Sequence, residues 1–329
     1  MSYPRLSRGA FVRLCILSFA LPIAVTSARA EWKDMNSDID ATNFIVKAGP
    51  IGDTKGLCTG TLISKQYKLV LTANHCLTNN ITVEEKEEAD DNGVVDKVKR
   101  EVYTDLQLEQ KSYEGFKSIG SATFVAAIVA HNKATDMGLL QLRGSTIPQT
   151  IYSHVLGADG KVTRGDSVFA VGNPRGLDAS VTHGIVSSTT RSFKITEDGD
   201  DQEFYQVDAA ITFGNSGGAL YNADGQLIGV LDAKGDAGLG FVTPLDVIHK
   251  FLNADCYEDV WNTDAAVKSH DQCVDDRLAA ENVRREKNGL PPLKADKTIS
   301  AGGAAFGAAK TLEDKPEPSL MQMLTGGAR

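Results

Sequence analysis

The chain has 329 residues, of which 42% are hydrophobic and 23% are charged. This is the composition of a globular protein with room for one large domain or two of moderate size. The formal net charge is −9, from 43 acidic and 34 basic residues, which argues against the basic face that non-specific nucleic-acid binding needs. We therefore expect no nucleic-acid partner.

The first thirty residues have the pattern of an export signal. They contain four arginines and no acidic residue, an apolar run covers 14–25, and Ala28-Arg29-Ala30 fits a cleavage site between small residues. The apolar run is too short to cross a bilayer and no later stretch is long enough, so we expect no stable membrane span; an uncleaved anchor is the alternative. The sequence predicts a signal peptide over 1–30 and an exported protein, periplasmic or secreted, that starts at Glu31.

Four cysteines follow this segment, an even number that is typical of exported proteins with disulfides. Pairing by proximity gives Cys58–Cys76 and Cys256–Cys273, which is one of the three connectivities that four cysteines allow. Zinc binding is the alternative, but no C-x-x-C pair occurs and the spacings do not suit a closed zinc site. We expect no bound metal and no cofactor.

Short strand-like runs alternate with turns in two blocks of similar size, the first over 43–142 and the second from Gly165 onward. Many short strands at regular spacing with glycine turns favour a closed or sandwiched β architecture. The expected strands are 68–73, 123–130, 138–142, 167–172, 180–188, 204–207, 226–233 and 240–243.

A strongly acidic stretch, EEKEEADDNG at 84–93, interrupts the first block. Such a charge run cannot pack into a core, so the sequence predicts a solvated loop over 83–96. A calcium-binding loop is the alternative, but the alternating oxygen ligands and the distal glutamate of such a loop are absent.

The second block is followed by helical and then by polar sequence. Helical periodicity over 244–252 predicts a helix that closes the domain against the second block. A short polar helix is expected over 275–287, where Gly289 and two prolines stop it. Small residues, charges, proline and glycine dominate 294–329, and this composition predicts disorder.

The segment DAAITFGNSGGAL at 208–220 carries the candidate nucleophile. Three glycines in GNSGG at 214–218 permit a tight turn in which backbone N–H groups converge on one point. Ser216 lies at the centre of this turn, and the N–H groups of Gly214 and Ser216 form the expected oxyanion hole. The alternative is a glycine-rich surface turn with an ordinary serine, because a serine is inert without a base.

His75 is the candidate base, because it directly follows an apolar strand and stands beside a cysteine. Asp136 is the candidate carboxylate, because it leads into a fully apolar strand where an unpaired charge is costly. His131, which follows a strand close to Asp136, competes with His75, and Asp208 is the second choice of carboxylate. The histidines without a comparable context are His154, His183, His249 and His270.

Three motifs resemble those of trypsin-like serine proteases. CTGTLI at 58–63 followed by LTANHC at 71–76 looks like the histidine motif, whose two cysteines form a disulfide in that family. DMGLL at 136–140 is similar to the aspartate motif, and GNSGG at 214–218 to the nucleophile motif. The order of histidine, aspartate and serine is also the order in that family.

Within that superfamily the second block resembles the bacterial HtrA/Deg-like branch. The resemblance rests on GNPRGL at 172–177, VTHGIVS at 181–187 and DAAI at 208–211, and it covers about 43–252. The chain differs from that branch in its paired cysteines. The sequence after Cys273 is too short and too polar for the peptide-binding PDZ domain of HtrA proteins, so we expect none.

The resemblance implies an all-β fold of two six-stranded antiparallel β-barrels packed face to face, with a C-terminal helix and a disordered tail. The expected parts are a signal peptide (1–30), an N-terminal barrel with the histidine and aspartate (31–157), a C-terminal barrel with the nucleophile (158–253), and a disulfide-closed segment with a short helix and the tail (254–329).

The resemblance also implies an exported serine endopeptidase that acts on a protein or peptide substrate through an acyl-enzyme. Ser216 attacks the peptide carbonyl, His75 moves the proton and Asp136 orients His75. The alternative is a non-catalytic or latent homologue that acts as a binding or regulatory module. A self-processing protease with one narrow substrate is a further alternative, whereas an esterase or lipase is disfavoured by the motif order.

Two positions depart from the trypsin-like pattern. Asn215 stands where zymogens of that family carry an aspartate, so activation by an ion pair with a new N-terminus is not expected. Ala210 stands where enzymes with basic specificity carry an acid. With Ala210 and Ile211 there, we expect a pocket for small or medium aliphatic side chains. The segment 231–234 is the candidate strand for pairing with the substrate backbone.

Overall fold

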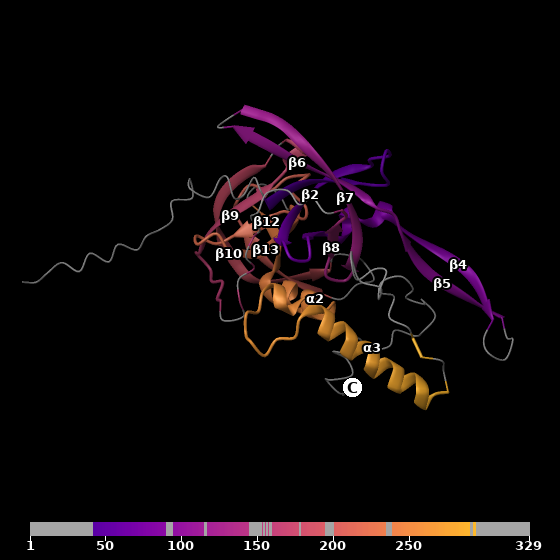
Figure 1. Ribbon diagram of the computed structural model, residues 1–329. Helices are drawn as coiled ribbons and strands as arrows, with labels where there is room; N and C mark the ends of the chain where they lie inside the picture. Colours follow the sequence, from indigo (N-terminus) through magenta and orange to yellow (C-terminus); the bar gives the residue numbers. More distant parts are fainter. Residues whose placement is uncertain are drawn as a thin grey trace, which may run out of the picture.

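The computed structural model describes residues 42–89, 95–114, 117–144, 160–177, 179–194, 201–234 and 239–289, together with residues 153, 155, 157, 292 and 293. The predicted signal peptide, the centre of the acidic stretch at 90–94, His154 and the predicted disordered tail from 294 lie outside these residues. The described chain forms two closed β-barrels, a projecting hairpin and two α-helices (Figure 1).

Each barrel consists of six antiparallel strands, which confirms the predicted fold class. The first barrel has the order β1-β2-β3-β8-β7-β6, with β1 Asn43–Ala48, β2 Gly56–Ser64, β3 Leu69–Ala73, β6 Leu106–Glu114, β7 Lys117–Asn132 and β8 Met137–Leu142. The second barrel has the order β10-β11-β14-β13-β12-β9, with β9 Ser167–Gly172, β10 Ser180–Lys194, β11 Asp201–Val207, β12 Ala219–Tyr221, β13 Leu227–Lys234 and β14 Gly240–Pro244. All eight strands predicted from the sequence overlap strands of these barrels.

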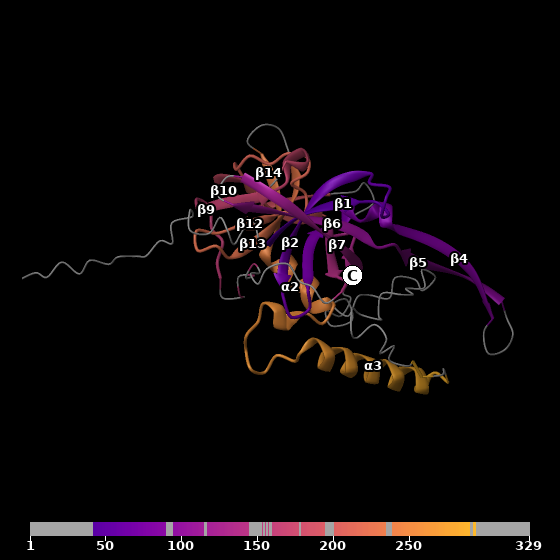
Figure 2. The same cartoon turned by 45° about the horizontal axis from the view of Figure 1, so that its top comes forward.

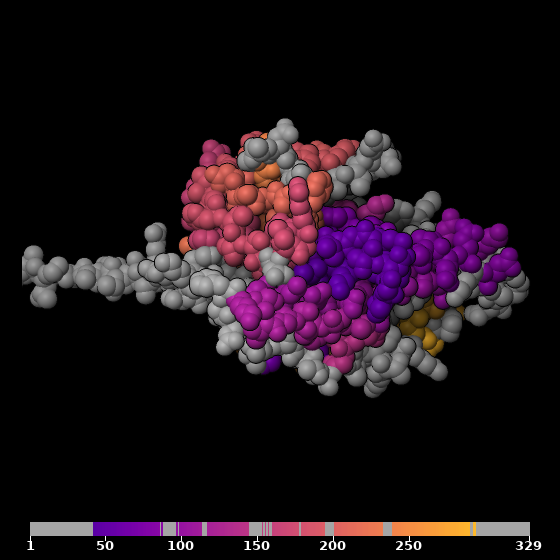
Figure 3. Space-filling model, turned by 90° about the horizontal axis from the view of Figure 1, so that it is seen from above, coloured from indigo at the N-terminus to yellow at the C-terminus, as the bar shows by residue number. Residues whose placement is uncertain are grey.

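The two barrels pack face to face and share a hydrophobic core. In β3, the side chain of Val70 fills the interior of the first barrel, whereas Leu69 and Leu71 belong to the shared core. The second barrel contributes Val171 of β9 and Val230 of β13 to the same core. Because such strands are buried on both faces, they read in the sequence as continuous apolar runs without alternation. Figure 3 shows the two barrels as adjoining lobes, indigo to purple and salmon to orange.

The acidic stretch forms part of a β-hairpin, and the prediction of a loop over 83–96 is wrong. Strand β4 (Ile81–Ala89) pairs with β5 (Val95–Tyr103) in a two-stranded sheet that projects from the first barrel (Figures 1 and 2). Three of its acidic positions face basic ones across the hairpin, namely Glu84 with Arg100, Glu85 with Lys99 and Glu87 with Lys97, whereas Glu88 faces Asp96. Opposite charges in register stabilise strand pairing while the side chains stay in water, so the hairpin needs no core beneath it.

Two α-helices follow the second barrel. Helix α2 (Leu245–Ala254), which the periodicity predicts, buries its apolar face against the shared core. Helix α3 (His270–Lys287) begins five residues earlier than expected, because Ser269 and Gln272 form a capping box at its start. It lies along the outside of the molecule, and none of its residues is buried (Figure 2). Neither helix has the length and apolar character that a membrane span requires.

Candidate active site

His75 and Asp136 meet where two neighbouring strands of the first barrel end. His75 lies in the short helix η2 (Asn74–Cys76) after β3, and Asp136 directly precedes β8, the partner of β3. Asp136 has a positive φ of 48°, and its backbone C=O accepts the N–H of Asn74 at 2.9 Å. The antiparallel pairing of β3 with β8 therefore brings together two residues that are 61 positions apart.

The Asp136 carboxylate holds His75 by two hydrogen bonds. Its Oδ1 accepts the backbone N–H of His75 at 2.8 Å, and its Oδ2 lies 2.6 Å from the ring Nδ1. Asp136 is only 3% exposed, whereas 46% of the His75 side chain is exposed. A proton on Nδ1 donates to this carboxylate, so the neutral ring keeps Nε2 as an acceptor on its exposed side.

The charges around His75 favour its protonated form. Partial burial of the ring acts to lower its pKa, but the hydrogen bond to Asp136 and the negative charge of Asp136 outweigh this effect. The pKa of His75 is therefore raised above its ordinary value of 6.5. A ring with a raised pKa is a stronger base, as proton abstraction from a hydroxyl requires.

Ser216 lies in a turn of the second barrel that is hydrogen-bonded to the first barrel. Thr59 of β2 donates its backbone N–H to Ser216 O at 2.8 Å and its hydroxyl to Gly214 O at 2.7 Å. Gly217 has a φ of 83°, and a Cβ atom there would lie 2.3 Å from both Thr59 O and Thr72 Oγ1. The glycines thus allow the turn to lie directly against β2.

The backbone of this turn presents two N–H groups, on Gly214 and Ser216. The C=O of Phe213 accepts the N–H of Arg175 at 2.8 Å, so the Gly214 N–H of the same trans peptide points the opposite way. Within the part of the chain that the structure describes, neither the Gly214 N–H nor the Ser216 N–H donates to a protein acceptor. Two such groups are available for an oxyanion.

The Ser216 hydroxyl donates to the backbone C=O of Asp232 at 3.2 Å. Among the described residues no hydrogen bond joins it to His75. Hydrogen bonds between catalytic groups are often absent or long without substrate and form only in the substrate complex.

Asp232 of β13 is a member of the site that sequence reasoning missed. Its carboxyl group, the carboxyl group of Asp136 and the His75 ring lie within 4.8 Å of one another. Asp232 is 8% exposed, and burial followed by the charge of Asp136 raises its pKa to about 8. An acid between apolar residues, as in GVLDA at 229–233, is the sequence signal that could have identified it.

The structure does not bring the competing candidates into this site. His131 binds Asn74 Oδ1 through Nδ1 at 3.0 Å and Glu101 Oε2 through Nε2 at 2.9 Å. The exposed Asp208 accepts the N–H of Ile185 at 2.7 Å. The other described histidines have partners elsewhere, namely Ser167 for His183, Trp261 for His249 and Tyr257 for His270.

The residues expected at the specificity pocket follow β11 in the second barrel. Ala210 is exposed, and its C=O accepts the Thr182 hydroxyl at 2.9 Å. Ile211 packs against the core of this barrel and against Gly240, where a Cβ atom would lie 2.5 Å from Ile211 Cδ1. The absence of a side chain at Gly240 thus leaves room for Ile211. The buried Asn215 packs on Gly172.

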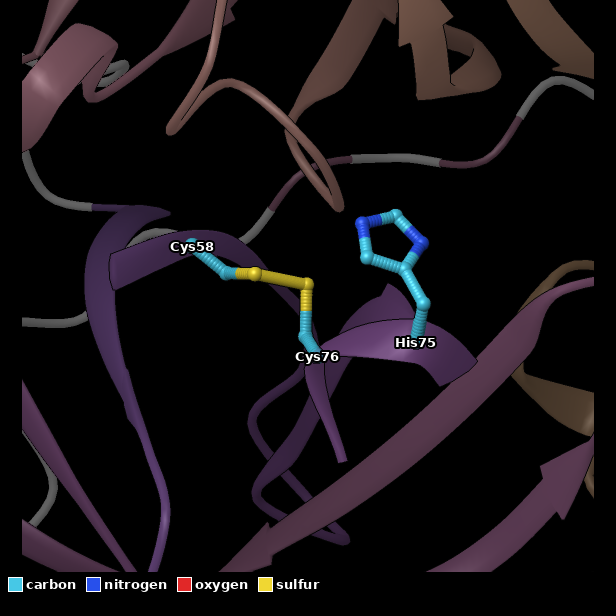
Figure 4. Close-up of side chains that lie close together, drawn as sticks. All are labelled: Cys58, His75 and Cys76. Atoms are coloured by element: carbon cyan, nitrogen blue, oxygen red, sulfur yellow. A yellow bond between two sulfur atoms is a disulfide. The ribbon is translucent and has the colours of Figure 1, made fainter. Parts of the chain in front are cut away.

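The structure contains both expected disulfides. Cys58–Cys76 joins β2 to the short helix that carries His75, and Figure 4 shows the imidazole beside it, extending away from its own helix. Cys256–Cys273 joins α3 to the segment after α2. The sulfurs beside His75 carry no thiolate and are not metal ligands. The His75, Asp136 and Asp232 donors are close enough for a metal, but the Nδ1 that faces them is bound to Asp136.

Comparisons with known proteins give one family and several relatives. The family model described as a trypsin-like peptidase domain matches residues 58–230. The curated proteins named "Serine protease HTRA2, mitochondrial" are similar over 131 residues, with 39% identity in Drosophila willistoni and 38% in Drosophila virilis. These regions cover 40% of this chain but only 29% and 30% of the relatives, so the chain matches less than a third of their length.

Among solved structures, the serine endoprotease from Yersinia pestis is similar to this chain with 23% identity and a TM-score of 0.47. The similarity covers 66% of this chain and 65% of that one.

Proposed function

The chain belongs to the family of trypsin-like peptidase domains, and we propose that it is a serine endopeptidase that hydrolyses peptide bonds through an acyl-enzyme intermediate. Ser216 is the proposed nucleophile, His75 the general base and Asp136 the residue that orients His75. The observation that carries the proposal is the double hydrogen bond from His75 to the buried Asp136. It fixes the tautomer that leaves Nε2 able to take a proton from a hydroxyl.

The proposed reaction proceeds in two halves. Ser216 Oγ attacks the carbonyl carbon of the scissile peptide while its proton moves to His75 Nε2. The C–N bond then breaks, His75 gives the proton to the departing amine, and the acyl group remains on Ser216. Water repeats the sequence with His75 as base and releases the carboxylic acid. The N–H groups of Gly214 and Ser216 stabilise the oxyanion that forms in both halves.

The orientation of the Ser216 hydroxyl favours one alternative function. Because it donates to Asp232 O, attack requires rotation about the Cα–Cβ bond toward His75. In the alternative, this rotation does not occur without an activator, and the chain is a latent or non-catalytic homologue that acts as a binding or regulatory module.

The proposed substrate side chain at the cleavage site is small or medium and aliphatic. Ala210 and Ile211 support this preference, because neither supplies a charge for an arginine or lysine side chain. A peptide library cleaved by the enzyme should show valine, alanine or leucine before the scissile bond. Enrichment of basic residues there would contradict the assignment of this pocket.

We further propose that the protein is exported to the periplasm or the medium. The basic and apolar segment at 1–30 and the two disulfides support export, because disulfides persist in oxidising compartments. Expression of the full chain in a bacterial host, followed by mass measurement of the exported product, should give a protein that starts at Glu31. A product that stays in the cytoplasm with residues 1–30 attached would contradict export.

Labelling with a fluorophosphonate tests the nucleophile and the base together. The parent protein should be labelled, and Ser216→Ala and His75→Ala should both abolish labelling. His183→Ala is the matched control, because His183 binds Ser167 outside the site. A folded, disulfide-bonded parent that remains unlabelled would favour the latent or non-catalytic homologue.

A further inference from the structure

Two buried carboxyl groups lie side by side behind His75. Asp136 is 3% exposed and Asp232 is 8% exposed, and both belong to the cluster of donor atoms that lie within 4.8 Å of one another. Two carboxylates removed from water repel each other strongly, so a pair at this distance retains one proton under conditions in which isolated carboxyl groups are ionised.

The backbone of β13 directs Asp232 into this position. In the pairing of β13 with β14, Leu231 faces Val242 and Ala233 faces Phe241, so Asp232 is an extra residue in a β-bulge. A bulge re-aims a side chain that regular alternation would place elsewhere. The backbone C=O of the same residue accepts the Ser216 hydroxyl, so the bulge lies beside Ser216 as well as beside Asp136 and His75.

The hydrogen bonds decide which carboxyl group holds the proton. Asp136 accepts the backbone N–H of His75 at Oδ1 and the ring Nδ1–H at Oδ2, so both of its oxygens already serve as acceptors. The buried Oδ2 of Asp232 accepts no hydrogen bond from any described residue. As a carboxylic acid, Asp232 needs no external donor, because the Asp136 carboxylate in the same cluster can accept its O–H.

We propose that Asp232 keeps its proton in the working enzyme and donates it to Asp136, so that an acid–carboxylate pair positions His75. The inference rests on the proposed function, in which Asp136 orients His75. Asp232 acts through Asp136 and is a positioning residue. When it ionises, its proton passes to water, the hydrogen bond is lost, and two negative charges repel each other beside His75.

Few titratable groups influence the ionisation of Asp232. Asp136 and His75 are the titratable side chains that act on Asp232, whose pKa of about 8 follows from burial and from Asp136. The strands packed on β13, namely β3, β12 and β14, carry no charged residue. Helix α2 also packs on β13, and it carries Asp246 and Lys250, which pair with each other at the surface, and His249, which stacks on Trp261.

The protonated carboxyl group is measured directly by its carbonyl stretching band in the infrared spectrum of the full chain. The parent should show this band at pH 7, and the band should disappear as the pH rises through about 8. Asp232→Asn should abolish it, whereas Asp224→Asn, in the exposed turn before β13, should leave it unchanged. Because Ser216→Ala should retain the band, this measurement does not depend on activity.

The pH profile of kcat/KM tests the positioning role. The parent should lose activity as the pH rises through about 8, and Asp232→Asn should not, because its amide donates to Asp136 without titrating. At pH 7 Asp232→Ala should be slower than Asp232→Asn by about tenfold or more, since misplacement of a catalytic group is costly.

The outcomes distinguish the proposed acid–carboxylate pair from the proposed endopeptidase activity. Absence of the carboxyl band at pH 7 in the folded parent would overturn the acid–carboxylate pair, whatever the activity. Equal alkaline profiles for the parent and Asp232→Asn would overturn its positioning role. A parent that shows the titrating band but resists fluorophosphonate labelling would retain the pair and contradict the endopeptidase.

Discussion

Thr59 of the first barrel donates its backbone N–H to the C=O of Ser216 in the second barrel, with an N to O distance of 2.8 Å. The same strand, β2, is joined through Cys58 to Cys76, the neighbour of His75. One short segment of β2 thus holds both the proposed nucleophile turn and the proposed base. The relative placement of the two barrels therefore determines the relative placement of the Ser216 and His75 side chains.

The Thr59 hydroxyl should be as important as its backbone. It donates to Gly214 O at 2.7 Å and accepts the Asn173 N–H at 2.9 Å, so Thr59→Val leaves two buried polar groups without partners. We expect a loss of about 2–4 kcal/mol in the free energy of unfolding and slower fluorophosphonate labelling. Urea unfolding measures the first effect, with Thr82→Val in the exposed hairpin as control. An unchanged labelling rate would show that Thr59 does not shape the turn.

Gly217 should tolerate no side chain. Gly217→Ala combines a positive φ of 83° with a Cβ atom 2.3 Å from Thr59 O. Gly165 is a matched control, because its φ is 94° but nothing lies within 4 Å of a Cβ atom there. We expect Gly165→Ala to cost about 1–2 kcal/mol of stability from backbone strain alone, and Gly217→Ala to cost more and to abolish labelling. Equal melting temperatures for the two variants would contradict the clash with β2.

The two disulfides should differ in their effect on the site. Replacing Cys58 and Cys76 by serine removes the link between β2 and the helix that carries His75. We expect this variant to lose about 2–4 kcal/mol of stability together with fluorophosphonate labelling. Replacing Cys256 and Cys273 releases only α3, so labelling should persist. Loss of labelling in the second variant alone would reverse this assignment.

The activity should fall on the acidic side as His75 takes up a proton. The base is the neutral ring, and its pKa is raised above 6.5, so kcat/KM should decline as the pH falls through a value above 6.5. Asp136→Asn removes the hydrogen bond and the charge that raise this pKa. It should move the decline to lower pH and reduce kcat by about 10⁴-fold. NMR titration of the His75 ring in Ser216→Ala gives the same pKa without turnover, and a pKa below 6.5 there would contradict the prediction.

The sequence by itself predicted the fold class and the disulfide pairing that the structure contains, and it supplied the candidates for the proposed triad. Each of these depends on short motifs whose chemistry is local, such as an apolar strand that ends at His75 or glycines around Ser216. The choice of Asp136 over Asp208 also followed from local context, because an acid that leads into an apolar strand needs a buried partner.

Only the tertiary structure decided the hairpin, the role of Thr59 and the place of Asp232. The charges at 84–87 exclude burial in a core but do not exclude a strand. Only the partner strand β5 shows that Glu84, Glu85 and Glu87 lie opposite basic residues. The direction in which the Asp232 side chain points depends on a bulge in the pairing of β13 with β14. Its place beside Asp136 depends on the packing of the second barrel against the first. Register and burial are properties of residue pairs that are distant in the chain, so local sequence patterns do not specify them.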